Sequence, residues 1–294
     1  MIREKTYGFF KRVIRKGLLN WMPTPSYLKL YYRLAIGKKL DLRNPLTFNE
    51  KLQWLKINMQ NPLYTTMVDK YDVKHYVSNN IGKEYIIPTL GVWNRAEDID
   101  FEALPEKFVL KTTHDSGGIK IIDKSKGYDK EEMIFFFNKR LKRSLYSLTR
   151  EWPYKSVKPR IIAEEYMIDN STDELRDYKF FCFGGICRCM KVDFGRFKEH
   201  RANYYDPQGN LLDFGEVLYP PDREKNIILP TNMDKMIELA EILSNNIPFI
   251  RVDFYDVNGN IYFGELTFFP ASGFGALTDE NWNFKLGSWI DLPK

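Results

Sequence analysis

Two acidic residues lie near the C-terminus in a segment whose pattern predicts a β-hairpin. Alternating runs over 251–255 and 262–267 flank an Asn-Gly turn. Asp253 and Glu265 are on opposite arms, each near the middle of an otherwise apolar strand. Two buried carboxylates that face each other repel unless a cation lies between them, and such hard oxygen ligands suit Mg²⁺ carrying a nucleotide phosphate. The alternative is one surface acid and one structural ion pair with Arg251.

A second segment has the composition of a phosphate-binding loop. Lys111 ends an apolar run, and the loop 112–118 that follows contains Ser116, Gly117 and Gly118. Backbone N–H groups of such a loop can close over phosphate oxygens because glycine lets the backbone approach, and Lys111 adds a positive charge. The segment is not a Walker loop, since G-K-[ST] is absent. A plain hairpin loop explains the pattern equally well.

Two further segments carry groups that suit a nucleoside. The run 160–167 predicts a strand that ends in acids, and the edge formed by residues 163–167 could present backbone groups to an adenine ring. Asp177 begins the next predicted strand, where an acid is suited to accept hydrogen bonds from ribose hydroxyls. Solvated acids that cap a strand are the alternative for both segments.

A basic run follows the second of these segments. It consists of Arg196, Lys198, His200 and Arg201, in a predicted loop that could reach the other sites. The run could bind a substrate carboxylate or a lipid-linked diphosphate, or it could be a solvated loop.

Composition indicates an ordinary globular protein with an unusual aromatic content. The 294 residues are 44% hydrophobic and 15% aromatic, enough for one large or two modest domains. Net charge is +5, but the first 40 residues hold ten basic residues and one acid, so the remainder is mildly acidic. The three cysteines lack the count and spacing of a zinc site, and we expect them to be reduced. We expect a cytoplasmic protein without a nucleic-acid partner.

The coarse pattern predicts helices first and alternating elements afterwards. Residues 5–21 predict a basic amphipathic helix, which could lie on an anionic membrane at the inner face of the cell membrane or pack on the next helix. Thr47 and Glu50 form a capping-box pattern that opens a helix over 48–58. Other expected helices are 26–37, 64–79, 129–148 and 232–245. Expected strands are 89–93, 107–111, 119–123, 160–167, 177–183 and 186–193.

In chain order these segments resemble the ATP-grasp superfamily, which includes carboxylate–amine ligases. More closely, the stretches NPLTFNEKLQWLK, NPLYTTMVDKY, KPRIIAEEYM, RDYKFFCFGG and FIRVDFY…IYFGELTF are similar to the TupA-like ATP-grasp family. That family is named for teichuronopeptide biosynthesis and occurs in polysaccharide gene clusters, where members are often labelled glycosyltransferases. The resemblance covers about residue 40 to the C-terminus.

The resemblance implies a fold and a division of the chain. The fold class is α/β (α+β), with two α+β subdomains that grip ATP. Residues 1–60 would form a basic helical N-terminal extension, and residues 61–294 the ATP-grasp domain. Within it, 61–160 would carry the glycine loop, and 161–294 the nucleotide- and metal-binding part.

The resemblance also implies roles for the nucleotide-binding residues. Lys70 and Lys111 would hold the α and β phosphates, and the loop of Ser116, Gly117 and Gly118 would cover the β/γ end. The residues implied to contact the adenosine part are Glu164, Glu165, Tyr166, Met167, Asp177 and Lys179.

Metal contacts are implied in the same way. Asp253 and Glu265 would ligate Mg²⁺, and Arg251 would stabilise the transferring phosphoryl group. Thr267 occupies the position where the family usually has an Asn as third ligand, so this sequence departs from the pattern there. The expected substrate contacts are Arg196, His200 and Arg201 from the basic run, together with Ser272 and Gly273.

The activity that follows is formation of an amide from a carboxylate and an amine through an acylphosphate, with ATP and Mg²⁺ as cofactors. The substrate would be a small or lipid-linked saccharide, such as a uronic acid joined to an amino acid or amino sugar. A glycosyltransferase is the first alternative and needs an acidic metal motif such as D-x-D, whereas the metal acids here lie on paired strands. An ATP-dependent sugar phosphotransferase and a non-catalytic ATP-binding module are the others.

Overall fold

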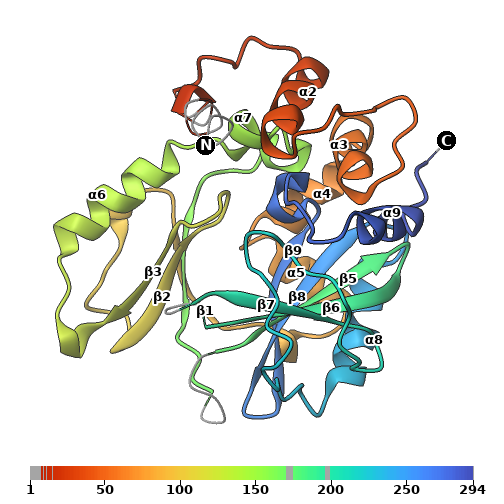
Figure 1. Ribbon diagram of the computed structural model, residues 1–294. Coiled ribbons are helices and arrows are strands. Elements are labelled where there is room, and N and C mark those ends of the chain that lie inside the picture. The colour runs from red at the N-terminus through yellow and green to blue at the C-terminus, as the bar shows by residue number, and fades with distance from the viewer. Residues whose placement is uncertain are drawn as a thin grey trace.

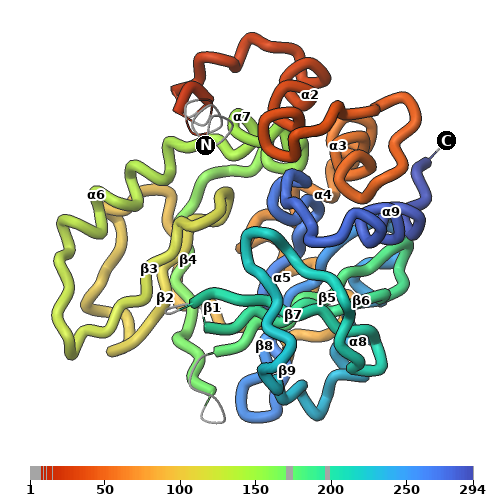
Figure 2. Tube along the Cα trace, viewed as in Figure 1, coloured from red at the N-terminus to blue at the C-terminus, as the bar shows by residue number. Residues whose placement is uncertain are grey.

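Two antiparallel sheets dominate the computed structural model, which describes residues 8, 10, 12–14, 16–169, 175–195 and 199–293. The first sheet consists of β1 (Thr89–Trp93), β2 (Lys107–Thr112), β3 (Ile119–Asp123) and β4 (Ile161–Glu165), in the order β1-β4-β2-β3. Helix α6 (Lys130–Leu141) lies along its outer face (Figures 1 and 2). Met133 and Phe137 of α6 share an apolar core with Phe108 and Leu110 of β2.

The second sheet is longer and carries the predicted hairpin. Its strands are β5 (Asp177–Phe183), β6 (Ile186–Phe194), β7 (Arg201–Tyr205), β8 (Ile250–Val257) and β9 (Asn260–Thr267), in the order β7-β6-β5-β8-β9. Helix α8 (Met233–Ser244) packs on β5, β6 and β8. The predicted acids meet as expected, because Asp253 of β8 is the register partner of Glu265 of β9. Cys182, Cys187 and Cys189 are buried and free, as predicted.

The N-terminal helices sit over one end of both sheets (Figure 1). They are α2 (Thr24–Ala35) and α3 (Phe48–Asn58), and α3 packs against α9 (Glu280–Ser288). The capping box is present, since Thr47 Oγ1 accepts from the Glu50 backbone and the Glu50 carboxylate accepts from the Thr47 backbone. No helix in the described residues is long and apolar enough to cross a membrane.

Only part of the predicted amphipathic helix, residues 5–21, lies within the described residues. Phe10 and Ile14 are buried there in a cluster with Tyr27 and Leu28 of α2. The ring of Phe10 meets that of Tyr31 edge-on at 5.3 Å. Of the two roles expected for this segment, packing on the next helix is therefore the one that the described residues adopt.

Two predicted helices are each interrupted. Residues 64–79 form α4 (Pro62–Val68) and α5 (Val73–Asn80), because the Asp69 carboxylate accepts from the backbones of Tyr71 and Asp72 and ends the first helix. Residues 129–148 form α6 and α7 (Leu145–Thr149), and Ser144 caps α7. The strand predicted over 160–167 is shorter, as β4. The 3₁₀ turns are η1 (Lys83–Tyr85), η2 (Ala96–Asp98), η3 (Lys124–Lys126), η4 (Trp152–Lys155) and η5 (Pro270–Gly273).

Candidate active site

A cavity of about 390 Å³ is walled by both sheets and by the loops at their ends. Its lining includes side chains from β2, β4, β8 and β9, so it lies where the two halves of the molecule meet. Eleven residues expected from the sequence to bind nucleotide, metal or substrate line it: Lys70, Lys111, Ser116, Gly117, Gly118, Glu164, Asp177, Arg251, Glu265, Thr267 and Ser272. Segments spread over about 200 residues thus bring eleven of the expected side chains and loop residues to one cavity.

Lys70 is held at the cavity by the break between α4 and α5. Its Nζ donates to the Asp115 carbonyl at 2.8 Å. The neighbouring Asp69 is fixed by Arg160, whose guanidinium lies 2.8 Å from its carboxylate and 2.7 Å from that of Asp72. Burial lowers the pKa of the Lys70 ammonium, while the nearby Glu265 carboxylate opposes that shift. An anion brought to this point would therefore strengthen the charged form of Lys70.

The glycine loop is tightly folded against its own strand. Thr112 Oγ1 donates to the Asp115 carboxylate, and the Thr112 backbone N–H donates to the Gly118 carbonyl at 2.7 Å. A Cβ on Gly118 would clash with Thr112 Oγ1 and with the Asp115 carboxylate, so the loop could admit a larger residue only if these side chains shifted. Arg140 of α6 pairs with the Asp115 carboxylate at 2.6 Å and donates to the Ser116 carbonyl. These contacts fix the loop at the edge of the cavity.

Lys111 and Glu164 form an ion pair on neighbouring strands. Lys111 Nζ lies 2.5 Å from Glu164 Oε2, and Lys74 Nζ of α5 lies 2.5 Å from Glu164 Oε1. The three side chains are 17%, 7% and 12% exposed, respectively. Burial would raise the pKa of Glu164, but the two lysines outweigh it and hold the pKa below its usual value. Glu164 is therefore ionised and holds two lysines at the cavity, in addition to any contact with a nucleotide.

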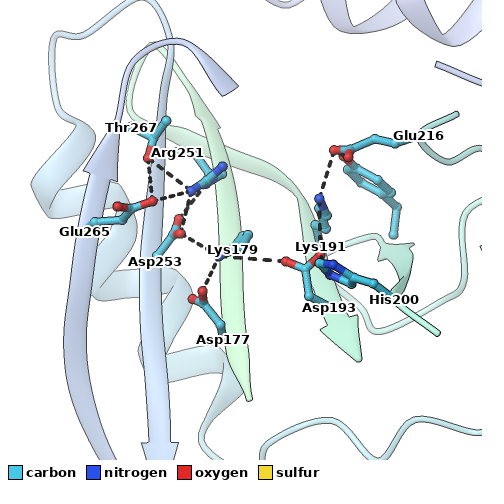
Figure 3. A network of polar contacts seen from close by, with 11 residues as sticks. Asp177, Lys179, Lys191, Asp193, His200, Glu216, Arg251, Asp253, Glu265 and Thr267 are labelled. Atoms are coloured by element: carbon cyan, nitrogen blue, oxygen red, sulfur yellow. Dashed lines mark hydrogen bonds and ion pairs between the residues drawn. The ribbon is translucent and has the colours of Figure 1, made fainter. Parts of the chain in front are cut away.

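The cation that separates the hairpin carboxylates is Arg251 (Figure 3). Its guanidinium donates to both Asp253 oxygens at 2.6 Å, to Glu265 Oε1 at 2.7 Å and to Thr267 Oγ1 at 3.1 Å. Burial would raise the pKa of Glu265, but Arg251 and Lys70 hold it below its usual value. The alternative expected from the sequence, a structural ion pair with Arg251 and one partly exposed acid, is the arrangement that these contacts show.

A further row of charges extends from the hairpin along the same sheet (Figure 3). Lys179 is buried, donates to Asp253 Oδ2 at 2.8 Å and pairs with Asp177. It does not line the cavity, although Asp177 does. The ammonium also lies 3.8 Å from the Asp193 carboxylate of β6. Lys179 therefore orders acids behind the cavity wall, a place that differs from the nucleotide contact expected of it.

The oxygen atoms at the hairpin fit a hard divalent cation in part. Glu265 has a side chain that is 44% exposed and borders the cavity together with Thr267, although Glu265 Oε1 and the Thr267 hydroxyl both accept from Arg251. Asp253 is 1% exposed, and its two oxygens are engaged by Arg251 and Lys179. Among the described residues, no three His, Cys, Asp or Glu side chains are grouped as a metal site. A cation could thus be held by Glu265 and Thr267, and Asp253 could join only if Arg251 moved.

The remaining expected site residues lie elsewhere. Glu165 is the last residue of β4, Tyr166 and Met167 follow it, and all three are absent from the cavity lining. His200 pairs with Asp193 at 3.0 Å, and its ring lies against that of Tyr219. Arg201 was expected in a loop but is the first residue of β7, and it pairs with Glu199. Gly273 is buried just beneath the lining. Arg196 lies outside the described residues. The sequence does contain one D-x-D pattern, Asp-Ile-Asp at 98–100, but it starts at the last residue of η2 and none of its residues lines the cavity.

The turn η5 forms one wall of the cavity in a strained conformation. Ala271 and Ser272 have φ of 47° and 54°, in the left-handed region that L-residues rarely adopt. Two side chains of helix α3 form hydrogen bonds to this turn. Gln53 donates to the Gly273 carbonyl at 2.8 Å, and Lys56 donates to the Ser272 carbonyl at 2.7 Å. Residues 1–60, predicted as an extension, thus include a helix whose polar side chains support this wall.

Sequence reasoning missed four charged residues of the site. Lys74, Asp115 and Glu151 line the cavity, and Arg140 pairs with Asp115 behind it. Asp115 lies inside the glycine loop, and its position between Thr112 and Gly118 was a usable signal. The others lie in helices or loops far along the chain from their partners, and no local pattern marks them.

A family model described as TupA-like ATP-grasp matches residues 50–291. The chain belongs to this family. Its architecture, with a cavity gripped between two sheets, is the ATP-grasp fold expected from the sequence. A search of curated proteins gave no match.

Several solved structures are similar to this TupA-like ATP-grasp protein at low identity. D-alanine–D-alanine ligase from Bacillus anthracis is 16% identical with a TM-score of 0.38, covering 69% of this chain and 57% of that one. N5-carboxyaminoimidazole synthetase from Staphylococcus aureus is 17% identical with a TM-score of 0.38, covering 69% and 44%. The ATP-grasp ligase PsnB, complexed with Mg and ADP, is 10% identical with a TM-score of 0.38, covering 74% and 57%. The chain spans about half the length of the structures it matches.

Proposed function

We propose that the protein is an ATP- and Mg²⁺-dependent carboxylate–amine ligase that acts on a precursor of a cell-surface polysaccharide. The observation that carries the proposal is the convergence of Lys70, Lys111 and Arg251 with the glycine loop and the Glu265 carboxylate around one cavity. Positive charges and backbone N–H groups suit a triphosphate, and carboxylate and hydroxyl oxygens suit its magnesium ion. The saccharide substrate follows from the biosynthetic context for which the family is named.

The chemistry requires an acid to be activated before an amine can attack it. A carboxylate oxygen attacks the γ-phosphorus of ATP, ADP leaves, and the acylphosphate that forms gives the acid a good leaving group. Lys111 and Lys70 would hold the phosphates in line, and Arg251 would neutralise charge on the transferring phosphoryl group. Bound Mg²⁺, held by Glu265 and Thr267, would supply additional charge neutralisation at the phosphates. The protein's contribution is therefore mainly positioning and electrostatic stabilisation.

Calorimetric titration of ATP with Mg²⁺ into the wild type and Glu265→Ala tests the nucleotide site. We expect micromolar ATP binding that is lost in the variant, and no signal with UDP-sugars. Binding of a UDP-sugar without ATP would contradict the ligase proposal and favour a glycosyltransferase.

Turnover is then tested with acids and amines in pairs. Glucuronic and galacturonic acid are combined with glycine, L-glutamate or glucosamine, and ATP-dependent phosphate release is measured. Release that requires both an acid and an amine supports ligation. Release that requires only a sugar with a free hydroxyl would instead identify a phosphotransferase.

A further inference from the structure

Glu151 is a buried acid at the cavity that the proposed chemistry does not yet use. It is 5% exposed and borders the cavity beside Ser272. The preceding residue, Arg150, ends α7 with φ of 57°, and its guanidinium donates to the Leu19 carbonyl at 3.0 Å. The backbone that places Glu151 is thus locked by a left-handed residue and by a contact 131 residues away. This is the support expected of a positioned functional group.

Glu151 differs from the other acids of the lining in its partners. Each of the others forms an ion pair with a basic side chain: Asp115 with Arg140, Glu164 with Lys74 and Lys111, Asp177 with Lys179, and Glu265 with Arg251. Among the described residues, Glu151 has no ion pair within the 4.0 Å that defines these. Its backbone N–H donates to Thr149 Oγ1 at 3.4 Å, and the uncharged Ser272 lines the same cavity. A buried carboxylate at a cavity without a salt-bridge partner is a suitable site for a cation.

The nearest basic side chain, Lys56, is committed to other groups. Its Nζ donates to the Thr149 carbonyl at 2.9 Å and to the Ser272 carbonyl at 2.7 Å. The same ammonium lies 4.5 Å from the centre of the Phe274 ring. Lys56 therefore fixes the two backbone segments on either side of Glu151 without neutralising it by direct contact.

We propose that Glu151 binds the ammonium group of the amine substrate and accepts the proton that this group must lose before it attacks. The inference rests on the proposed ligase function and deepens it, since it identifies the second substrate as a primary amine that arrives protonated. The backbone of Glu151 is fixed by the bond from its N–H to Thr149 Oγ1, and its side chain borders the cavity in which the ammonium would arrive.

The step balances in atoms and charge. The ammonium transfers one proton to the Glu151 carboxylate and becomes a neutral amine with a free electron pair. That pair forms the C–N bond to the acyl carbon, the C–O bond to phosphate breaks, and phosphate leaves with both electrons. The nitrogen then loses its second proton to the departing phosphate, and Glu151 returns its own proton to solvent. No oxidant, reductant or further reactant is needed.

The electrostatic setting of Glu151 suits proton transfer. Burial raises the pKa of the Glu151 carboxyl, and the charge of Lys56 only partly opposes this shift. Burial likewise lowers the pKa of Lys56 to about 7. A carboxyl with a raised pKa is a stronger base once ionised, which narrows the gap to the pKa of an amine.

Hydroxylamine separates the role of Glu151 from the rest of the reaction. It is uncharged at neutral pH and attacks an acylphosphate to give a hydroxamate without first losing a proton to a base. Wild type, Glu151→Gln and Glu151→Asp are compared with ATP, Mg²⁺ and the uronic acid that supports turnover, using either hydroxylamine or the productive amine. We expect Glu151→Gln to keep hydroxamate formation within about twofold and to lose at least about 100-fold in kcat/KM for the amine, as removal of a general base does. Glu151→Asp should recover part of the loss.

The outcomes separate this inference from the function on which it rests. Unchanged amide formation in Glu151→Gln would overturn the role of Glu151 and leave the ligase function standing. Equal losses with hydroxylamine and amine in both variants would also overturn it, because Glu151 would then serve only the fold. If the wild type forms neither hydroxamate nor amide with any of the acids, the ligase proposal itself fails, and the role of Glu151 with it.

Discussion

The buried pair of Lys111 with Glu164 gives the sharpest test of how the cavity is built. The change is Glu164→Gln, which keeps the shape of the side chain and removes its charge. In the wild type this carboxylate lies 2.5 Å from the ammonium groups of both Lys74 and Lys111. The variant would leave two positive charges close together and largely out of water.

The contacts that survive determine how much stability is lost. Lys74 keeps acceptors at the Ile87 carbonyl, 2.7 Å away, and at the Thr89 hydroxyl, 2.9 Å away. Lys111 loses its charged partner, and breaking one side of a buried pair costs about 3–5 kcal/mol. Because the Gln carbonyl can still accept a hydrogen bond, we expect about 3 kcal/mol. For a chain of this size that loss lowers Tm by about 6–12 °C.

ATP should compensate for the missing carboxylate if the lysines face its phosphates. A ligand that binds only the folded state stabilises it by about 2.7 kcal/mol at 100 times its Kd. In Glu164→Gln, the phosphates would meet Lys74 and Lys111 without competition from a carboxylate, so ATP should raise Tm by more than it does in the wild type.

Thermal unfolding followed by circular dichroism, with and without ATP and Mg²⁺, measures both effects. Glu165→Gln is the matched control, because this neighbouring acid is exposed and outside the cavity lining, and its Tm should change by less than about 2 °C. A fall of Tm in Glu164→Gln no larger than that of the control would refute the energetic reasoning. An ATP-induced rise equal to that of the wild type would refute the placement of the lysines at the phosphates.

Three further predictions follow from the same side chains. Gly118→Ala should weaken ATP binding at least about tenfold, because the new Cβ would clash with Thr112 Oγ1 and force the loop open. Calorimetry measures this effect, and an unchanged Kd would contradict it. Arg251→Lys should lose the paired contacts to Asp253 and lower the free energy of unfolding by about 2–4 kcal/mol in denaturant titrations, whereas full stability would mean that the guanidinium fork is dispensable. The pKa of Glu164 is lowered in the fold, so the unfolded chain binds more protons below its own pKa of about 4.3. The stability from this group is therefore present above that pH and lost as pH falls further, and stability of the wild type should drop more steeply there than that of Glu164→Gln.

The sequence predicted best where local chemistry determines structure. An Asn-Gly turn between two alternating runs fixes the register of a hairpin, and a slip of one residue would turn every side chain to the other face. The register set by the turn holds as far as the pair Phe254 and Phe263. On its own it would place Asp253 opposite the glycine before Glu265. A bulge at that point moves Asp253 opposite Glu265, and the turn signal did not predict this bulge. The same alternation places Arg251 on the face of Asp253, two residues away, which is why a structural ion pair with Arg251 could be given as an alternative from the sequence.

Prediction failed where two distant segments determine the outcome. Lys74 meets Glu164 across 90 residues, and neither position carries a local signal for the other. The helix expected over 64–79 is interrupted for a related reason. The Asp69 carboxylate accepts a hydrogen bond from the backbone N–H of Tyr71 and also pairs with the distant Arg160. Helical periodicity continues through that break, so the apolar pattern alone cannot detect it.

The charges of the cavity bear on how ATP can enter it. Among the described residues, the lining holds four basic side chains and five acids, 4 − 5 = −1, with Lys70, Lys74, Lys111 and Arg251 against Asp115, Glu151, Glu164, Asp177 and Glu265. A triphosphate would thus meet a lining with no net attraction, because most of the basic groups already have carboxylate partners. Its binding requires either that these pairs separate or that cations accompany it. A bound divalent cation would change the net charge of the lining from negative to positive while Lys111 and Arg251 kept their carboxylate partners. The proposed Mg²⁺ dependence therefore follows from the net charge of the lining as well as from its oxygen ligands.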